Sequence, residues 1–448
     1  MLISPGIMGR LALLLTLLLL LAGCAVRQAA PALKEDPMKR IAESYVKLVL
    51  ALGQHDADYV DAYYGPPEWR TEAKARKRPL PEIRSESETL IADLAAHPPA
   101  AGDEEVVRLR HQYLQRQLQS MVARIDLVSG KKMSFDEESK ALYDAVAPTY
   151  GAAHFQEILD QLEREVPGSG PLAERVEAFR QQLVIPRDRL DAVFGAAIDE
   201  CRRRTLHHIE LPAGESFVVE YVTHKAWSGY NWYKGGFHSL IQVNTDLPIF
   251  IDRAIDLACH EGYPGHHVYN SLLEKHLVRD RGWVEFSVYP LFSPQSLIAE
   301  GTANFGIEVA FPGHERTIFE REKLYPLAGL DPARAERYAE IQGLLQGLSY
   351  AGNEAARQYL NGKNVNGEIS RQEAEAWLVR YALMSPERAA QRVRFIDQYR
   401  SYVINYNLGQ DLVRQYIEKR GGTPERPEER WREFAKLISS PRLPSGLR

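Results

Sequence analysis

Three histidines and one glutamate fall within the eight residues His260–His267, whose sequence is HEGYPGHH. The opening His-Glu pair is typical of the H-E-x-x-H helix, in which two histidines one turn apart bind zinc and the glutamate acts as general base. In this chain the position four residues after His260 is occupied by Pro264. The spacing therefore predicts a metal site formed by His260 and either His266 or His267, against the alternative of hydrogen-bonded core histidines.

Helix geometry separates the two candidates only in part. On a straight helix, His267 would lie about 20° short of two full turns from His260, whereas His266 would lie about 120° away. A straight helix is not expected here, because Pro264 cannot donate to the carbonyl of His260 and its ring clashes there. Gly265 relaxes the backbone further. A kink or an inserted bulge would bring His266 round, so we favour His266 and keep His267 as the alternative.

A third ligand is expected from the apolar stretch 296–306, which contains a single acid, Glu300. A carboxylate among apolar neighbours is costly to bury unless it is paired or bound to a metal. Two histidines, one glutamate and an open position form a known catalytic zinc shell. We therefore predict Zn²⁺ bound by His260, His266 or His267, and Glu300, with Glu308 as a weaker supporting acid. The alternative for Glu300 is an ion pair with an arginine.

The predicted catalytic residues are Glu261, as general base, and Tyr406. A tyrosine directed at the metal can donate a hydrogen bond to a tetrahedral oxyanion. Tyr402 and Tyr406 are four residues apart and share a helical face, although such an aromatic stripe is also common in a plain core. Arg392 and Arg394 are minority candidates for binding a substrate carboxylate.

The elements that position these residues are predicted to be mostly helices. Apolar spacing predicts helices over 38–52, 82–97, 103–128, 136–163 and 171–203, and one long helix from about 386 to 420. The aromatic segment 59–69 is interpreted as a packed turn or a cleft wall. Residues 214–247 are rich in β-branched and aromatic residues and predict a small antiparallel sheet, with Asn244, Tyr230 and His238 as candidate cleft residues and Tyr402 as a further substrate-binding candidate. The predicted fold class is mainly α with a small antiparallel β-sheet, divided into a helical region 37–213 and a catalytic region 214–448.

Residues 1–23 have the pattern of a signal peptide, with Arg10 before a short leucine-rich run. The sequence Leu21-Ala22-Gly23-Cys24 resembles the bacterial lipobox, which implies cleavage before Cys24, acylation of its thiol and a tether over 24–36. Ala25 then favours the outer membrane. The alternative is a plain secretory signal with an incidental cysteine.

Two further cysteines, Cys201 and Cys259, could form a disulfide in an oxidising compartment or remain buried thiols, and we favour thiols. The net charge of −5 and the absence of a basic tract in the sequence disfavour nucleic-acid binding.

Four segments together resemble the bacterial family catalogued as domain of unknown function 885. They are His260–His267, Glu300–Ala303 (EGTA), Tyr406–Gly409 (YNLG) and Leu443-Pro444. This family is often found as lipoproteins and is grouped with the gluzincin metallopeptidases, so the resemblance implies a helical, cleft-forming peptidase-like fold with a zinc signature at His260, Glu261 and His266. The chain departs from the family where Thr302 replaces a tryptophan and where Ile307 replaces a second acid.

These observations favour a lipid-anchored, periplasm-facing zinc peptidase acting on small peptides. Two alternatives remain open at this stage. One is a zinc amidase acting on cell-wall or N-acyl compounds, and the other is a metal-binding or scaffold lipoprotein without catalysis.

Overall fold

The computed structural model describes residues 36–361 and 369–448, and Ile41–Arg448 form one compact unit. The predicted signal peptide, Cys24 and nearly all of the tether lie outside the described residues. None of the described helices is long and apolar enough to cross a membrane.

The first half of the chain is helical, but two of the predicted helices are each divided in two. The segment 136–163 breaks at Asp144, which has a positive φ of 56° and is followed by Pro148 and Gly151. The segment 171–203 breaks before Pro186, which cannot continue a helix. The observed helices are α2 (Pro37–Leu52), α3 (Pro67–Arg76), α4 (Leu80–Ala96), α5 (Glu105–Val128), α6 (Phe135–Tyr143), α7 (Ala152–Glu165), α8 (Leu172–Gln181) and α9 (Leu190–His208).

A three-stranded sheet follows, with the order β2 (Ser216–Val222), β4 (His238–Asn244), β3 (Gly229–Gly235). Strands β3 and β4 form an antiparallel hairpin, whose turn uses positive φ at Gly235 and Gly236. The hairpin places β4 between β2 and β3, so β4 runs parallel to β2. The prediction of a wholly antiparallel sheet was therefore wrong for this pair, because the third strand and not the second occupies the centre.

The aromatic segment 59–69 contains a strand and is more than a turn. Strand β1 (Val60–Tyr63) pairs antiparallel with β5 (Val288–Pro290), 228 residues further along the chain. This pairing places Asp61 beside the elements that carry the histidine motif.

The motif itself lies on an interrupted helix. Helix α10 (Asp252–Leu257) continues into a π-helical turn, Ala258–Gly262, and α11 (His266–Leu273) begins after a cis Tyr263–Pro264 bond. A kink or bulge was expected at this place, and the structure contains one.

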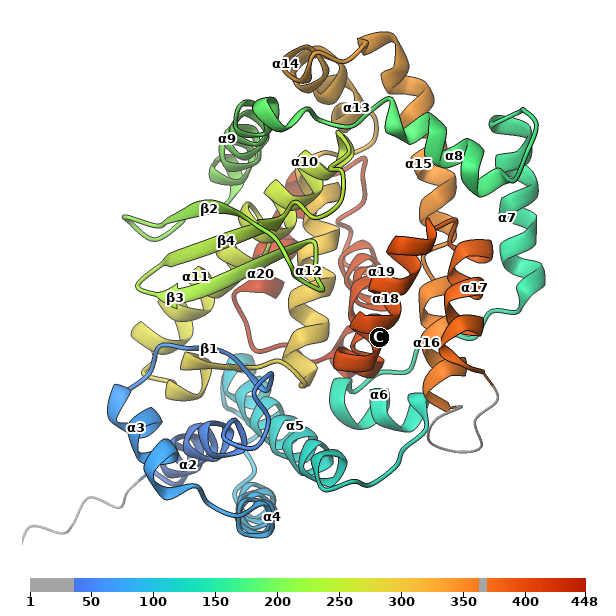
Figure 1. Cartoon of the computed structure of the whole chain (residues 1–448). Helices are drawn as coiled ribbons and strands as arrows, with labels where there is room; N and C mark the ends of the chain where they lie inside the picture. The colour runs from blue at the N-terminus through green and yellow to red at the C-terminus, as the bar shows by residue number, and fades with distance from the viewer. Residues whose placement is uncertain (1–35, 362–368) are drawn as a thin grey trace, which may run out of the picture. The chain divides into compact units, whose positions relative to one another are not determined.

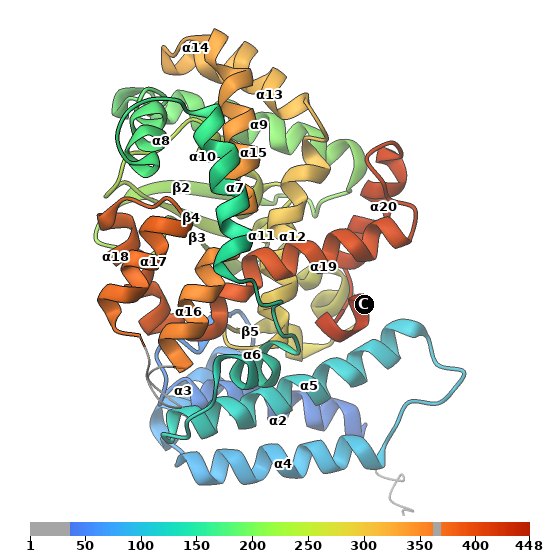
Figure 2. The same cartoon turned by 90° about the vertical axis from the view of Figure 1, so that its right-hand side faces the viewer.

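Helix α12 (Pro294–Ala310) is buried along almost its whole length and packs against α19 (Ile404–Lys419), as Figures 1 and 2 show from two directions. The contact is backbone to backbone. A Cβ on Gly301 would overlap the backbone of Gly409, and a Cβ on Gly409 would lie 2.7 Å from the carbonyl oxygen of Leu297. Glycine at both positions therefore lets the two helices approach closely.

The long C-terminal helix predicted over 386–420 is divided at Arg400, which has a positive φ of 55°. Neither proline nor glycine marks this break. The buried carboxylate of Glu138 accepts hydrogen bonds from Arg400 Nε at 2.8 Å and from Ser401 Oγ at 2.7 Å, so a partner from α6 stabilises the turn. The remaining helices are α13 (Glu315–Phe319), α14 (Tyr325–Ala328), α15 (Ala335–Gly347), α16 (Ala351–Asn361), α17 (Arg371–Tyr381), α18 (Pro386–Tyr399) and α20 (Pro427–Ile438). The predicted class, mainly α with a small sheet, is confirmed.

Candidate metal centre

The interrupted helix determines which histidine faces His260. Within the turn, the Gly265 N–H donates to the carbonyl of Cys259 at 2.9 Å, and a Cβ on Gly265 would overlap the carbonyl of His260. Only glycine fits this tight reversal, after which α11 starts with His266 as its first residue. The reversal brings the His266 ring edge-to-face against the His260 ring, with centroids 4.7 Å apart.

Three ligand atoms converge at this point. His260 Nε2 lies 3.1 Å from His266 Nε2 and 3.2 Å from Glu300 Oε2, and His266 Nε2 lies 3.7 Å from the same oxygen. Zinc bonds of about 2.0–2.1 Å in tetrahedral geometry require ligand atoms roughly 3.3 Å apart. Glu300 Oε2 is also buried without a hydrogen-bond partner. The separations and the unpartnered oxygen both fit a bound cation.

Neighbouring side chains fix the orientation of these ligands. Asn304 Nδ2 donates to the carbonyl of Tyr406 at 3.0 Å, which leaves its Oδ1 to accept from His260 Nδ1 at 2.9 Å. The proton is thereby held on Nδ1, and Nε2 keeps a lone pair for a metal. The Tyr402 hydroxyl donates to Glu300 Oε1 at 2.7 Å. Tyr402, a substrate-binding candidate from the sequence, therefore contacts a candidate metal ligand.

The charges of the cluster are strongly coupled. Burial alone would lower the pKa of His260, but the neighbouring carboxylates of Glu300 and Glu261 raise it to about 9. Burial alone would raise the pKa of Glu300, yet His260 and His266 hold it far below its usual range. In the absence of a metal the cluster therefore retains a proton, which a cation must displace.

Glu261 lies next to this group, on the wall of a cavity of about 1100 Å³ that is also lined by His260, His266 and Glu300. The side chain of Glu261 is buried, and its backbone carbonyl accepts a 2.7 Å hydrogen bond from Asn231. A Cβ on Gly229 would lie 3.0 Å from Glu261 Oε1, so the absence of a side chain on β3 makes room for this carboxylate.

His267 does not join the cluster. It is fully buried, its Nε2 lies 2.9 Å from Glu215 Oε2, and its Nδ1 lies 2.9 Å from Ser239 Oγ. Glu215 also accepts hydrogen bonds from Tyr263 at 2.6 Å and Arg202 at 2.7 Å. The structure thus places His266, and not His267, beside His260 and Glu300, and it gives His267 a buried ionic contact that links α11 to the sheet.

The other predicted residues divide into those that reach the cavity and those that do not. Tyr230, Tyr402, Tyr406, Glu308 and Arg392 line it. Tyr230 donates a short hydrogen bond to Asp61, and Glu308 is ion-paired with Arg414.

Asn244 was wrongly placed in the cleft by the sequence. Asn244 is the last residue of β4 and does not line the cavity, and its side-chain amide donates to the carbonyls of Lys225 and Trp227. His238 is exposed and contacts Ser216, and Arg394 is exposed as well.

Several cavity residues were not singled out from the sequence, and three of them contact other residues of the site: Asp61, Asn231 and Asn304. Asp61 is the most informative, because burial raises its pKa to about 6 despite the hydrogen bond from Tyr230. An acid inside the aromatic segment 59–69 was the only available signal. The two asparagines carried none, since their roles depend on partners distant in sequence.

The thiols of Cys201 and Cys259 are buried and free, with their sulfur atoms 2.9 Å apart. This separation exceeds the length of a disulfide bond, about 2.0 Å. The structure therefore has two adjacent thiols, in line with the favoured interpretation.

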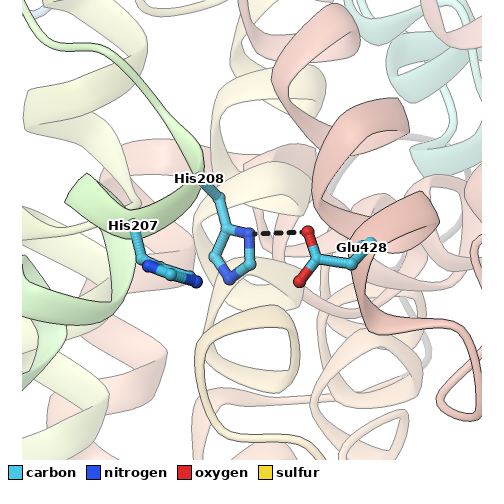
Figure 3. A group of neighbouring side chains, drawn as sticks. All are labelled: His207, His208 and Glu428. Carbon is cyan, nitrogen blue, oxygen red and sulfur yellow. Dashed lines mark ion pairs between the residues drawn. The ribbon is translucent and has the colours of Figure 1, made fainter.

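A second group of possible ligands lies at the ends of two helices, where His207 and His208 on α9 face Glu428 on α20 (Figure 3). His208 Nδ1 is 3.4 Å from Glu428 Oε2, and the ring stacks on Trp431. His207 and Glu428 are exposed. Packing on Trp431 and an ion pair account for this arrangement without a metal.

Comparisons with known proteins give no family assignment. No protein-family profile and no curated protein matches the chain. Similar solved structures include a candidate lipoprotein from Colwellia psychrerythraea, with 13% identity, a TM-score of 0.48, and coverage of 82% of this chain and 68% of that one. A carboxypeptidase from Pyrococcus furiosus has 12% identity and a TM-score of 0.40, with 90% of both chains covered. An M32 carboxypeptidase from Deinococcus radiodurans has 12% identity and a TM-score of 0.38, with 90% of this chain and 88% of that one covered. These values are too low to transfer an activity.

Proposed function

We propose that the chain is a metal-dependent hydrolase that cleaves small peptides, with Zn²⁺ held by His260, His266 and Glu300. The observation that carries the proposal is the convergence of the two imidazole nitrogens on the unpartnered, buried oxygen of Glu300. This group opens into a large cavity that also contains Glu261. A purely structural ion pair would not need an adjacent unused carboxylate or a cavity.

The roles of the residues follow from their positions. A divalent cation held by His260, His266 and Glu300 would supply Lewis acidity to a carbonyl and to water. Glu261 accepts the proton of the attacking water and delivers it to the leaving amine. Burial, reinforced by the charge of Glu300, raises the pKa of Tyr406 well above its usual value, so its hydroxyl remains a donor for the oxyanion that forms at the carbonyl carbon.

The size of the cavity supports short substrates. Pockets of about 300–1000 Å³ hold ligands of drug size, and the cavity of about 1100 Å³ has room for a short peptide. Its lining includes the aromatic side chains Trp227, Phe395 and Tyr399, which suit apolar substrate groups.

The proposed location rests on the sequence of the N-terminus. Acylation of Cys24 after cleavage would anchor the protein in the bacterial envelope, most consistently in the outer membrane facing the periplasm. The membrane is then a partner only through the lipid, and peptides of the periplasm are the substrates within reach.

The test uses the soluble form that starts after Cys24, loaded with Zn²⁺. Glu261→Gln should abolish hydrolysis of a peptide panel while retaining about one zinc per chain, measured by elemental mass spectrometry. Glu210→Gln, which removes an exposed carboxylate outside the cavity lining, is the matched control and should behave as wild type. A wild-type protein that binds no zinc, or a Glu261→Gln variant that retains turnover, would refute the assignment. Turnover of cell-wall or N-acyl amides in place of peptides would change the substrate and leave the chemistry intact.

A further inference from the structure

Six arginines line the cavity, and they fall into two groups. Arg253 and Arg316 form ion pairs with Asp256, and Arg430 lies 3.6 Å from Glu308. The other three form no ion pair within residues 36–361 and 369–448; they are Arg180, Arg388 and Arg392. Paired arginines have a structural explanation, whereas the unpaired ones require another.

Of the three unpaired arginines, Arg392 is the one with a contact to the predicted catalytic Tyr406 among the described interactions. Its guanidinium lies 5.2 Å from the Phe395 ring centroid and 5.9 Å from that of Tyr406. A Cβ on Gly352 of α16 would lie 3.7 Å from Arg392 Nη2, so the group also packs against a backbone that lacks a side chain. Its Nε is buried without a hydrogen-bond partner. Aromatic rings and a helix therefore hold the cation in position, but no described anion neutralises it.

The electrostatic surroundings agree with this geometry. Burial lowers the pKa of Arg392, and the nearby Tyr406 opposes this shift. The Arg392 side chain is half-buried, and its Nε is buried. A cation withdrawn from water without a partner destabilises a fold, so packing alone does not explain an arginine here. An anionic ligand would supply the missing charge.

The position of Arg392 relative to Glu300 limits what that ligand is. The Tyr402 hydroxyl donates to Glu300, and the Tyr402 ring lies 5.8 Å from that of Tyr406, whose ring centroid is 5.9 Å from the Arg392 guanidinium. Tyr406 thus lies between the candidate metal ligands and the guanidinium. A negative group bound by Arg392 would lie only a short distance along the substrate from the bond that is cleaved.

We propose that Arg392 binds the C-terminal carboxylate of a peptide substrate, so that the site releases the C-terminal residue. This inference rests on the proposed hydrolase function. The planar guanidinium matches a carboxylate with two parallel hydrogen bonds, which also fixes the substrate's orientation. The C–N bond to the last residue breaks, and water supplies a hydroxyl to the acyl carbon and a proton to the released amine. A carboxylate is present at the end of every unmodified peptide, whereas an acidic side chain is present in only some.

The experiment compares two blocked aromatic dipeptides that differ only in a terminal carboxylate or a terminal amide. Wild type should favour the acid by about 10- to 100-fold in kcat/KM, the range expected for hydrogen bonds to a charged group. Arg392→Gln should remove this preference by slowing the acid alone, and Arg392→Lys should restore part of it. Arg394→Gln, the same change at an exposed site on the same helix, should keep the wild-type preference. A third dipeptide with an acidic last side chain and a terminal amide tests the other source of a carboxylate.

Two further measurements separate this inference from the proposed function. Calorimetry on zinc-loaded Glu261→Gln should show tighter binding of the acid than of the amide, and the difference should vanish when Arg392→Gln is added. Urea unfolding of Arg392→Gln should show a midpoint no lower than wild type, because an unpaired buried charge is removed.

The outcomes are distinct. Equal turnover of acid and amide, or a preference unchanged in Arg392→Gln, overturns the inference and leaves the hydrolase standing. Arg392-dependent preference for the acidic side chain in place of the terminus overturns the C-terminal assignment. Arg392-dependent binding of the acid without turnover of any peptide supports the anchor and overturns the hydrolase.

Discussion

Replacing His267 by alanine should destabilise the protein while leaving zinc bound. Replacing His266 by alanine should abolish zinc binding with a smaller effect on stability. His267 is fully buried, and its two ring nitrogens lie 2.9 Å from Glu215 and from Ser239. Removing one partner of a buried ionic contact costs about 3–5 kcal/mol. Because Arg202 remains 2.7 Å from Glu215, we expect the lower end, about 3 kcal/mol.

His266 offers a contrasting case. Its Nε2 lies 3.1 Å from His260 Nε2 and 3.7 Å from Glu300 Oε2, which are the other two candidate ligand atoms. Its removal deprives the cation of one of three protein ligands, and in metal-free protein it should lower the unfolding free energy by less than His267→Ala does, because His260 Nε2 remains 3.2 Å from Glu300 Oε2.

The assay measures both quantities on the same preparations. Urea unfolding in chelator gives the stability of the metal-free fold, and elemental mass spectrometry after zinc loading gives the stoichiometry. For His267→Ala we expect about one zinc and a clearly lowered unfolding midpoint, and for His266→Ala we expect no zinc and a smaller fall in the midpoint. If His267→Ala loses zinc and His266→Ala keeps it, the ligand assignment drawn from the interrupted helix is wrong.

Three further predictions follow from the packing, the titration and the metal. Gly301→Ala should lower the unfolding free energy by about 1–3 kcal/mol, because its Cβ would overlap the backbone of Gly409, and urea unfolding measures this. Gly195→Ala, with open space around it on α9, is the control and should be neutral or stabilising. Asp61→Asn should stabilise the protein by up to about 3 kcal/mol at pH 7, because folding raises the carboxyl pKa from 3.8 to about 6 and the amide still accepts from Tyr230. Between these pKa values the folded wild type binds more protons than the unfolded chain, so its stability falls as pH rises; the advantage of the variant should disappear below pH 4, and a pH-independent advantage would contradict the burial argument. Chelation of zinc should lower Tm, with about 4 kcal/mol of stabilisation lost if zinc was present at about 1000 times its Kd, and an unchanged Tm in differential scanning calorimetry would show that no metal was bound.

Sequence reasoning succeeded where a local pattern carried the information. Pro264 and Gly265 predicted an interruption after His260, and the structure contains a π-helical turn there. The single acid in an apolar helix predicted that Glu300 needs a partner, and the structure places it against His260 and His266. Both arguments used only nearby residues and the cost of burying a charge.

It failed where a distant partner determines the structure. The division of the long helix at Arg400 depends on Glu138, 262 residues earlier, and no glycine or proline marks it. The place of Asp61 in the cavity depends on a strand pairing that spans 228 residues. The role of His267 depends on Glu215, whose burial the sequence does not indicate. Each of these contacts becomes visible only when the chain is folded.

The close contact of Gly301 and Gly409 gives a physical criterion for comparing future relatives of this chain. Each glycine is next to or near a site residue, Glu300 on α12 and Tyr406 on α19, and the spacing between these helices lets Tyr402 reach Glu300. No substitution at one position can compensate for a side chain at the other, because both already carry the smallest residue. A homologue that gains a side chain at either place must therefore separate the two helices. Such a homologue could keep the histidine motif and still lack the contact between Tyr402 and Glu300. The two glycines together should therefore identify relatives that retain this contact better than the histidines alone.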